Sequence, residues 1–292
     1  MSGRVARVAA HAKLNLFLRV LAREQDGYHT IETLFARIAL ADAVTVHVDT
    51  ADRTIDCGLA NAGPPEQNLA FRAAEAFRTA TGWPRGYHIE IAKRIPIGGG
   101  LGGGSADAGA VLRALAALSP VPVPGDALLQ MAMPLGSDVP FLTTTAPWAL
   151  AWGRGERLLA IAPLASRPVV LALPPFGVGT ANAYGWLAGT RARWEPHPTL
   201  FTLEALRSWE HVAALATNDF EPVVCARHPQ LASIIAALRG AGSAIATLSG
   251  SGSTAFGIFA DAPDRDLLQQ ALGVPISVTR TLDRIEPVDV MG

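Results

Sequence analysis

Six glycines crowd the eight positions from Gly98 to Ser105, and this density constrains the chain more than any other feature. Glycine in an ordered segment costs backbone entropy, so it is kept where the backbone takes a positive φ or where another group approaches the main chain closely. Packing alone gives little reason for so many residues without a Cβ. The residues from Ser105 onward predict a helix, because their apolar positions recur at helical spacing.

A glycine loop that leads into a helix directs unpaired N–H groups and the positive end of the helix dipole at one point. Such a point binds anions, most often phosphate. The Walker A pattern fails because Gly104 is followed by Ser105 with no lysine. The pattern G-x-G-x-x-G is matched at Gly98, Gly100 and Gly103, but a run of glycines matches it by chance and the loop does not follow the first strand. A flexible linker is disfavoured because linkers do not lead straight into a patterned helix. We therefore expect a distinct nucleotide-phosphate loop.

The composition sets the broad class of the protein. Half of the 292 residues are hydrophobic, 17% are charged and the formal net charge is −1, so the chain can bury a sizeable core. No run of lysine or arginine occurs, which argues against a nucleic-acid partner. The first residues lack the apolar core of a signal peptide, and no apolar run approaches the roughly 20 residues of a membrane helix. We therefore expect a cytoplasmic globular protein without a membrane partner.

The two cysteines, Cys57 and Cys225, lie far apart in the chain, and neither belongs to a CxxC or Cys/His cluster. This spacing disfavours both a disulfide scaffold and a structural zinc site.

We expect the chain to act as a monomer or a weak homodimer.

The first half of the chain predicts strands and one helix ahead of the loop. Apolar residues alternate from 14 to 20, which predicts a strand with Lys13 and Asn15 on the same face. A helix is predicted from the capping residue Asn68 to Gly82. The segment 87–93 predicts the strand that leads into the glycine loop.

The second half predicts the order strand, helix, strand, strand, helix, strand, which is typical of a ferredoxin-like domain. The strands are expected at 169–173, 244–248, 254–259 and 276–280, and the helices at 231–238 and 264–272. We expect the hinge between the two halves near residues 155–166.

A second glycine segment, Leu248-Ser-Gly-Ser-Gly-Ser-Thr254, lies between the two central strands of that domain. A Gly-Ser hairpin is the simplest interpretation. The glycines and hydroxyls beyond a hairpin's needs leave open a second interpretation, in which the segment forms another wall around the phosphates.

Asp138 lies in Gly136-Ser-Asp-Val-Pro140, where an aspartate is most often a turn or capping residue. It could also act as a general base that takes a proton from a substrate hydroxyl. Lys13 would most often be a solvated surface lysine, but its apolar neighbours allow it to sit beside an active-site carboxylate. One Asp, one Lys and a ring of N–H donors would suffice for phosphoryl transfer, in which the enzyme mainly positions groups and neutralises charge.

Asp26-Gly27 predicts a turn, and Tyr28 and His29 follow it. A lone histidine is more often a hydrogen-bonded structural residue than a catalyst. An aromatic ring beside a donor and acceptor can also stack on a nucleobase and read its edge.

Seven segments of the chain, taken together and in order, resemble the motifs of the GHMP kinase superfamily. They are 12–18, 26–30, 96–105, 136–141, 153–156, 218–221 and 249–253. The resemblance spans nearly the whole chain. The segments Asp-Gly-Tyr-His and Gly-x-Asp-Val-Pro are typical of the members that phosphorylate a cytidine-diphosphate-linked methylerythritol.

The resemblance implies an α+β, two-domain GHMP kinase fold. Its N-terminal domain would be of the ribosomal-protein-S5-like α/β type, its C-terminal domain would be ferredoxin-like, and the site would lie in the cleft between them. It further implies an ATP-binding domain over residues 1–160 and a substrate-binding domain over residues 161–292.

The resemblance also implies roles for individual residues. Asp138 would deprotonate the 2-hydroxyl of 4-diphosphocytidyl-2-C-methyl-D-erythritol, and Lys13 would polarise that pair. The residues expected to bind the phosphates of ATP are Pro96, Gly98, Gly99, Gly100, Leu101, Gly102, Gly103, Gly104 and Ser105. Ser105 is also the protein oxygen expected near Mg²⁺, although ATP and water would supply much of the metal's shell. The residues expected to bind the cytidine substrate are Asn15, Tyr28, His29 and Tyr184, with the two tyrosines on opposite faces of the cytosine.

We therefore expect an ATP-dependent kinase of that 2-hydroxyl, in the non-mevalonate route to isoprenoid precursors. One alternative is another small-alcohol kinase of the superfamily, of the homoserine or mevalonate type, which would not need Tyr28 and His29 to hold a cytosine. A more distant alternative is a nucleotide-binding module without activity. Such a module could lose Lys13 or Asp138 without penalty, so the presence of both favours an enzyme.

Three positions depart from the superfamily pattern. His11 stands in place of a common proline, and Ser137 replaces a common alanine beside Asp138. Gly109 falls inside the helix after the loop, where alanine is usual. We expect Gly109 to cost on the order of 1 kcal/mol of helix preference and to leave the site unaffected.

Overall fold

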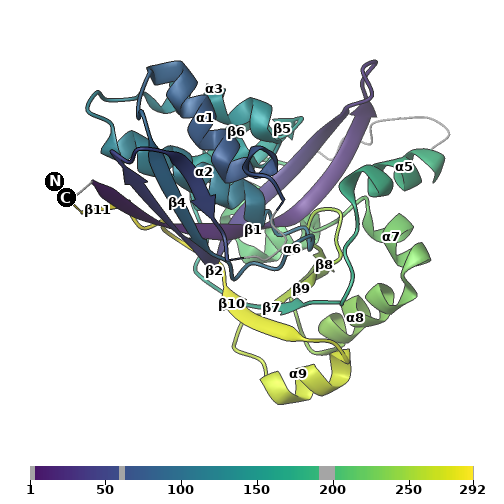
Figure 1. Ribbon diagram of the computed structural model, residues 1–292. Coiled ribbons are helices and arrows are strands. Elements are labelled where there is room, and N and C mark those ends of the chain that lie inside the picture. Colours follow the sequence, from purple (N-terminus) through teal and green to yellow (C-terminus); the bar gives the residue numbers. More distant parts are fainter. Residues whose placement is uncertain (1–3, 59–62, 191–200, 292) are drawn as a thin grey trace.

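The computed structural model describes residues 4–58, 63–190 and 201–291, and these residues form two sheets with helices packed on them (Figure 1). The larger sheet has seven strands and the smaller has four. The strands of the larger sheet are β1 (Val5–Arg23), β2 (His29–Val48), β3 (Arg53–Asp56), β4 (Tyr87–Ala92), β5 (Trp148–Gly153), β6 (Arg157–Ile161) and β11 (Asp289–Met291). The strands of the smaller sheet are β7 (Pro168–Ala172), β8 (Ile245–Leu248), β9 (Ala255–Ile258) and β10 (Ile276–Arg280).

Helices accompany both sheets. Those of the first half are α1 (Leu69–Thr81), α2 (Gly103–Leu118), α3 (Gly125–Ala132) and α4 (Val139–Thr143). Those of the second half are α5 (Thr180–Thr190), α6 (Trp209–Leu215), α7 (Glu221–Arg227), α8 (Pro229–Gly240) and α9 (Arg265–Leu272). Short 3-10 turns lie at Pro65–Gln67, Met133–Leu135 and Leu203–Arg207. No helix within the described ranges has the length and apolar character needed to span a membrane.

The larger sheet is built on β1 and β2, which form one long antiparallel hairpin. The predicted turn at Asp26-Gly27 joins them, and Gly27 takes the positive φ of 90° that this turn requires. Because β2 is so long, it pairs with β5 through residues 31–36 and with β4 through residues 43–48. The register of β1 shifts between His11 and Lys13, so a bulge lies beside the lysine.

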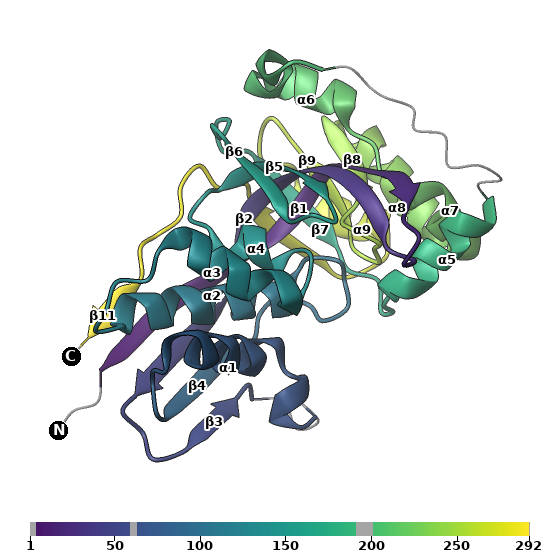
Figure 2. The same ribbon diagram turned by 90° about the horizontal axis from the view of Figure 1, so that it is seen from above.

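The helices α1, α2 and α3 gather on one side of this sheet (Figure 2). The predicted cap of α1 is confirmed, since the Asn68 side chain accepts a hydrogen bond from the N–H of Ala70 at 2.9 Å. The predicted end at Gly82 is confirmed as well, because Gly82 is left-handed. The helix α2 is buried along most of its length between β1, β2, α1 and α4, which suits its many alanines.

The smaller sheet confirms the predicted ferredoxin-like domain. Its strand order is β10-β7-β9-β8 with antiparallel neighbours, which is the order that a chain reading strand, helix, strand, strand, helix, strand gives in that fold. The helices α8 and α9 are the two connections, and α5 to α7 are additions before the second strand.

The two halves of the chain share their hydrophobic cores. Leu18 and Val20 of β1 pack in the cluster that contains β7 and α8, while Phe256 of β9 packs in the cluster of the larger sheet. The last strand, β11, pairs with β1, so the end of the chain returns to the first sheet, a point that the sequence left open. The boundary between residues 160 and 161 stays a prediction. The shared packing holds the tip of the β1–β2 hairpin beside α5 (Figures 1 and 2).

Candidate active site

Segments from both halves of the chain line one cavity. They bring together the two residues predicted for catalysis, the glycine loop and part of the second glycine segment. The residues of this cavity, called here the transfer cavity, include Lys13, Asn15, Gly98, Gly100, Gly102, Gly103, Gly104, Ser105, Ser137, Asp138, Arg154, Thr180, Tyr184, Gly250 and Ser251. A second cavity, called here the nucleoside cavity, shares the loop and adds Cys57, Asn68, Lys93, Pro96 and Asp107.

The glycine loop leads directly into α2, as predicted. Gly98, Gly100 and Gly102 have φ values of 76°, 78° and 73°, which only glycine adopts readily. Gly102 precedes the helix without a side chain that could cap it. The first-turn N–H groups of α2 therefore border a cavity with no capping side chain on them, as an anion site requires.

Contacts within the protein require some of these positions to be glycine. The expectation that packing gives little reason for these glycines was therefore wrong. A Cβ on Gly100 would lie 2.0 Å from the carbonyl oxygen of Ser249, and one on Gly99 would lie 2.5 Å from Oγ1 of Thr254. A Cβ on Gly104, in contrast, would make only an ordinary contact of 3.6 Å with Leu69. Packing thus explains Gly99 and Gly100, while the absence of a side chain at Gly104 leaves room for a ligand.

The second glycine segment connects β8 to β9 and also lies against the loop. The hydroxyl of Ser249 donates to the carbonyl of Gly100 at 2.9 Å, and the N–H of Thr254 donates to the carbonyl of Gly99 at 3.2 Å. Asn218 fixes this segment from behind, because its side-chain amide donates to the carbonyl of Gly250 at 2.8 Å. The segment is therefore more than a hairpin, and its contact with phosphate stays a prediction.

Lys13 and Asp138 meet beside the loop, with Nζ of Lys13 3.3 Å from a carboxylate oxygen of Asp138. The Lys13 side chain is 4% exposed and that of Asp138 is 29% exposed, so the lysine is buried and the carboxylate faces the cavity. Nζ also donates to Oδ1 of Asn15 at 2.7 Å. The bulge after His11 and the hydrogen bond from the Lys13 N–H to the Leu101 carbonyl hold the lysine at the loop.

Asn15 is held by a chain of hydrogen bonds that fixes its orientation. The hydroxyl of Thr33 donates to the carbonyl of Phe17 at 2.6 Å, so its oxygen accepts from the Asn15 amide at 2.8 Å. The carbonyl oxygen of the Asn15 side chain must then face Lys13. Asn15 is 3% exposed and positions Lys13, and its contact with substrate stays a prediction. No pattern in the sequence indicated a role for Thr33.

The position of Asp138 depends on how α4 packs against α2. A Cβ on Gly109 of α2 would lie 2.4 Å from the carbonyl oxygen of Leu142 in α4, closer than real Cβ atoms approach. Gly109 therefore has a packing role that helix preference alone did not indicate, and its effect on the site stays a prediction. Gly109 lets the backbone of α4 come close, and α4 begins directly after Asp138.

The residues predicted to bind cytidine lie together in a third cavity, called here the hairpin-tip cavity. It is lined by Arg23, Asp26, Gly27, Tyr28, His29, Ser137, Arg154, Thr180, Ala181, Tyr184, Gly185 and Ala188. The His29 ring stacks on the Tyr184 ring with 4.3 Å between centroids, and Tyr28 is 57% exposed. Burial and the nearby Arg23 lower the pKa of His29, which favours the neutral ring.

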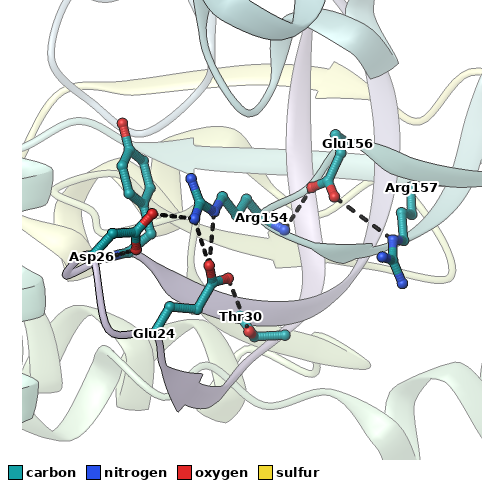
Figure 3. Close-up of polar contacts among 7 residues, drawn as sticks. Glu24, Asp26, Thr30, Arg154, Glu156 and Arg157 are labelled. Atoms are coloured by element: carbon teal, nitrogen blue, oxygen red, sulfur yellow. Dashed lines mark hydrogen bonds and ion pairs between the residues drawn. The ribbon is translucent and has the colours of Figure 1, made fainter.

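Two charged clusters near the loop were missed by the sequence analysis. Arg154 joins Glu24 and Asp26 at the hairpin tip (Figure 3).

The second cluster is centred on Lys93, which lies 2.5 Å from Asp42 and 2.7 Å from Asp107 next to the nucleoside cavity. Burial raises the pKa of Asp107 to about 7, against the attraction of Lys93. A lysine and an aspartate at either end of the glycine loop were the available signal, but nothing in the sequence indicated that Asp42 joins them.

The transfer cavity combines three features that phosphoryl chemistry uses. The loop offers main-chain N–H groups to an anion, Lys13 offers a buried positive charge, and Asp138 offers an open carboxylate that can accept a proton from an alcohol.

Two family models match the chain. The one described as GHMP kinases N terminal domain matches residues 68–145, and the one described as GHMP kinases C terminal matches residues 202–274. Among similar curated proteins, a 4-diphosphocytidyl-2-C-methyl-D-erythritol kinase of Geobacter sp. (strain M21) is 38% identical over 256 residues, which cover 87% of this chain and 90% of that protein. The enzyme of the same name from Anaeromyxobacter sp. (strain K) is 43% identical over 256 residues, which cover 86% of this chain and 79% of that protein.

Solved structures agree with these similarities. A crystal structure of 4-(cytidine 5'-diphospho)-2C-methyl-D-erythritol kinase matches with a TM-score of 0.76 and 36% identity, and the match covers 94% of this chain and 98% of that chain. A homoserine kinase from Cytophaga hutchinsonii matches with a TM-score of 0.70 over 100% of this chain and 98% of that chain. Its identity is only 16%, so this second likeness concerns the fold alone.

Proposed function

Because this chain belongs to the GHMP kinase family, we propose that it transfers the γ-phosphoryl group of ATP to the 2-hydroxyl of 4-diphosphocytidyl-2-C-methyl-D-erythritol. The relatives that carry this activity in their names are 37–43% identical over most of the chain, and a solved structure of such a kinase shares the fold. Within the molecule, the main support for the proposal is the Lys13–Asp138 pair, which lines the same cavity as the glycine loop and its main-chain N–H groups. Kinases named for homoserine or mevalonate resemble this chain at only 12–16% identity.

In this reaction Asp138 accepts the proton of the 2-hydroxyl. The oxygen then forms a bond to the γ-phosphorus, and the bond from that phosphorus to the β-γ bridging oxygen of ATP breaks to leave ADP. Lys13 places its positive charge 3.3 Å from the carboxylate of Asp138, where it would offset the negative charge that develops on the attacking oxygen and the phosphate. Little covalent chemistry falls to the protein, so positioning by the loop and by α4 carries much of the effect.

The phosphates of ATP are proposed to lie along residues 98–105, where the transfer and nucleoside cavities meet. A phosphate chain on the loop would lead from Asp138 in one cavity toward Asn68 and Lys93 in the other. The nucleoside of ATP is therefore proposed to occupy the nucleoside cavity. The exposed Gly104, which borders both cavities, is the position where a side chain would most directly block the phosphates.

A Mg²⁺ ion fits this site as a partner of ATP. Within residues 4–58, 63–190 and 201–291, no three His, Cys, Asp or Glu side chains lie close enough together to hold a metal ion. The hydroxyl of Ser105, in the first turn of α2, lines the transfer cavity and is the donor proposed for it. Mg²⁺ commonly keeps several waters and binds mainly through substrate phosphates, so one hydroxyl is an adequate protein contribution. When bound, the ion neutralises charge on the phosphate oxygens.

The cytidine end of the substrate is proposed to occupy the hairpin-tip cavity, in contact with Tyr28, His29 and Tyr184. This cavity shares Ser137, Arg154 and Tyr184 with the transfer cavity, so one molecule can span both. Tyr184 already packs on His29 and, edge-on, on Phe220. Tyr28 is the exposed ring and is the one proposed to stack on cytosine.

The direct test measures ADP release from ATP and Mg²⁺ with three acceptors: the cytidine diphosphate substrate, homoserine and mevalonate. Turnover with the cytidine compound alone is expected. Turnover with another alcohol would retain the kinase fold and reject the cytidine cavity. ATP binding without turnover on any acceptor would support a nucleotide-binding module instead.

A further inference from the structure

Arg154 connects two turns that come from distant parts of the chain. The tip of the β1–β2 hairpin contributes Glu24 and Asp26, and Arg154 lies in the turn between β5 and β6, residues 153–156. One guanidinium nitrogen, Nη2, lies 2.5 Å from a carboxylate oxygen of Glu24 and 2.5 Å from one of Asp26, while Nε donates to Glu24 at 3.2 Å. Figure 3 shows both acidic side chains reaching the same guanidinium.

The turn that carries Arg154 is itself fixed next to the proposed general base. Glu156 accepts a hydrogen bond from the main-chain N–H of Arg154 at 2.6 Å, which shapes the turn (Figure 3). Gly155 has a φ of 110°, and a Cβ there would lie 3.1 Å from the carbonyl oxygen of Ser137. Since Ser137 precedes Asp138, the turn is packed against the segment that holds the carboxylate.

Tyr28 lies within this set of contacts. The guanidinium carbon of Arg154 is 4.0 Å from the centre of the Tyr28 ring, within the range of a cation–π contact. The N–H of Tyr28 donates to Oδ1 of Asp26 at 3.1 Å, while Arg154 binds the other oxygen of the same carboxylate. The ring and the backbone of Tyr28 are therefore both restrained through one arginine.

The charges in this cluster favour a positioning role over direct binding of phosphate. The hydrogen bond from Arg154 lowers the pKa of Glu24, and hydrogen bonds from the N–H of Tyr28 and from Arg154 lower the pKa of Asp26. Both carboxylates are thus ionised at neutral pH and already exceed the charge of the guanidinium. An incoming diphosphate would meet two negative groups there, so its binding by Arg154 is disfavoured.

We propose that Arg154 is a positioning residue for the cytidine substrate. By holding the hairpin tip against the β5–β6 turn, it fixes the orientation of the Tyr28 ring in the hairpin-tip cavity, so that the ring is preorganised to stack on a cytosine. The inference rests on the proposed function and adds a residue to it that works through Tyr28. Surface ion pairs contribute little to global stability, so the effect is local to the cytidine end.

The test compares Arg154→Met with Arg157→Met. Arg157 is exposed, lies three residues further on, and contacts Glu156 at 3.7 Å, so it is a matched control for loss of an arginine beside this turn. We expect Arg154→Met to raise KM for the cytidine substrate about 3- to 10-fold, with KM for ATP and kcat within about twofold of the wild-type values. Arg157→Met is expected to change none of the three.

Binding of cytidine and of CDP, measured by calorimetry, separates the possible roles. We expect Arg154→Met to weaken both ligands by the same factor, and to have no further effect in a Tyr28→Ala background. A loss confined to CDP would overturn the proposal, because it would mean that Arg154 contacts the phosphates. Additive losses in the double variant would also overturn it, as would a lowered Tm with a raised KM for ATP, which would indicate a structural role.

The proposed function is tested separately by the wild-type protein. If wild-type protein binds neither cytidine nor CDP, the cytidine cavity itself is wrong. If the wild-type protein binds both and Arg154→Met is unchanged, the function stands and only the role of Arg154 fails.

Discussion

Two lysine–carboxylate clusters lie at the glycine loop, and their surroundings differ in one respect. In the transfer cavity, Lys13 faces the single carboxylate of Asp138, which is 29% exposed. Next to the nucleoside cavity, Lys93 faces two carboxylates, and the side chains of Asp42 and Asp107 are 0% and 6% exposed. The first cluster leaves a carboxylate open to a ligand, whereas the second encloses its charges.

Hydrogen bonds account for this difference. Oδ1 of Asp42 accepts from the main-chain N–H groups of Arg94 and Ile95, so Asp42 anchors the start of the loop as well as Lys93. The carboxylate of Asp138 has, among the described residues, only Lys13 as a side-chain partner. The same pair of residue types thus leaves an accessible carboxylate at one position, where we propose the chemistry, and encloses its charges at the other.

The largest effect is expected from Asp138→Asn, which keeps the shape of the side chain and removes the base. We expect kcat to fall about 10²- to 10⁴-fold, since general base catalysis contributes this much. ATP binding and Tm should stay close to the wild-type values, and both are the controls. A kcat near normal would remove Asp138 as the base.

Substitution of Lys93 should mainly reduce stability, whereas substitution of Lys13 should mainly reduce activity. Lys93→Met leaves two carboxylates buried without their cation, so we expect it to lower the free energy of unfolding by about 3–5 kcal/mol. Lys13→Met, the matched variant, should lower kcat far more than it lowers Tm. Denaturant unfolding and steady-state kinetics on both variants check this, and equal behaviour of the two lysines would contradict the comparison.

Alanine substitutions at Gly104 and Gly100 should distinguish the side of the loop that borders the cavity from the side that packs on the protein. Gly104→Ala adds a methyl group that the protein can accommodate, so we expect normal stability with KM for ATP raised about 10-fold. Gly100→Ala would force the methyl group against the Ser249 carbonyl and should lower Tm. If Gly104→Ala left ATP binding unchanged, the phosphates would not lie at that position.

Asp107 should give the buried cluster a pH dependence. Its pKa of about 7 in the folded protein lies above the value near 4 in an unfolded chain, so folding favours the protonated form. This stabilising contribution is complete below about pH 4 and is lost as the pH rises through about 7. Between about pH 5 and about pH 8 the wild type should lose about 2–3 kcal/mol of unfolding free energy relative to Asp107→Asn. Parallel stability curves for the two proteins would show that Asp107 is ionised throughout.

The smallest effect is expected from Gly109→Ala. Alanine improves helix preference by about 1 kcal/mol, but the added Cβ would press on the backbone of α4, which costs about 1–3 kcal/mol. We expect a net loss of stability of about 1 kcal/mol and a several-fold lower kcat, because Asp138 moves with α4. Thermal unfolding and steady-state kinetics test this prediction. A stabilised, fully active variant would show that the α4 backbone can shift without loss of stability or activity.

Much of the architecture could be predicted from local patterns. The cap at Asn68, the turn at Gly27 and the ferredoxin-like order of the second half each depend on neighbouring residues or on the sequence of elements. The packing constraint on Gly109 was not predicted, because it comes from the carbonyl of Leu142, which tertiary packing brings close. Arg154 lies in the segment 153–156, but its role was not predicted, because its partner Glu24 lies 130 residues away in the chain.

The sequence by itself determined the glycine loop at a helix start, the separate segments that carry Lys13 and Asp138, and the family to which the chain belongs. These follow from backbone conformation and from short motifs, which act over a few residues. Only the tertiary structure decided which glycines serve packing and which border an open cavity, that Lys93 is enclosed while Asp138 stays open, and that Arg154 contacts the Tyr28 ring. Burial and charge pairing depend on residues that are distant in the chain, so no local pattern records them.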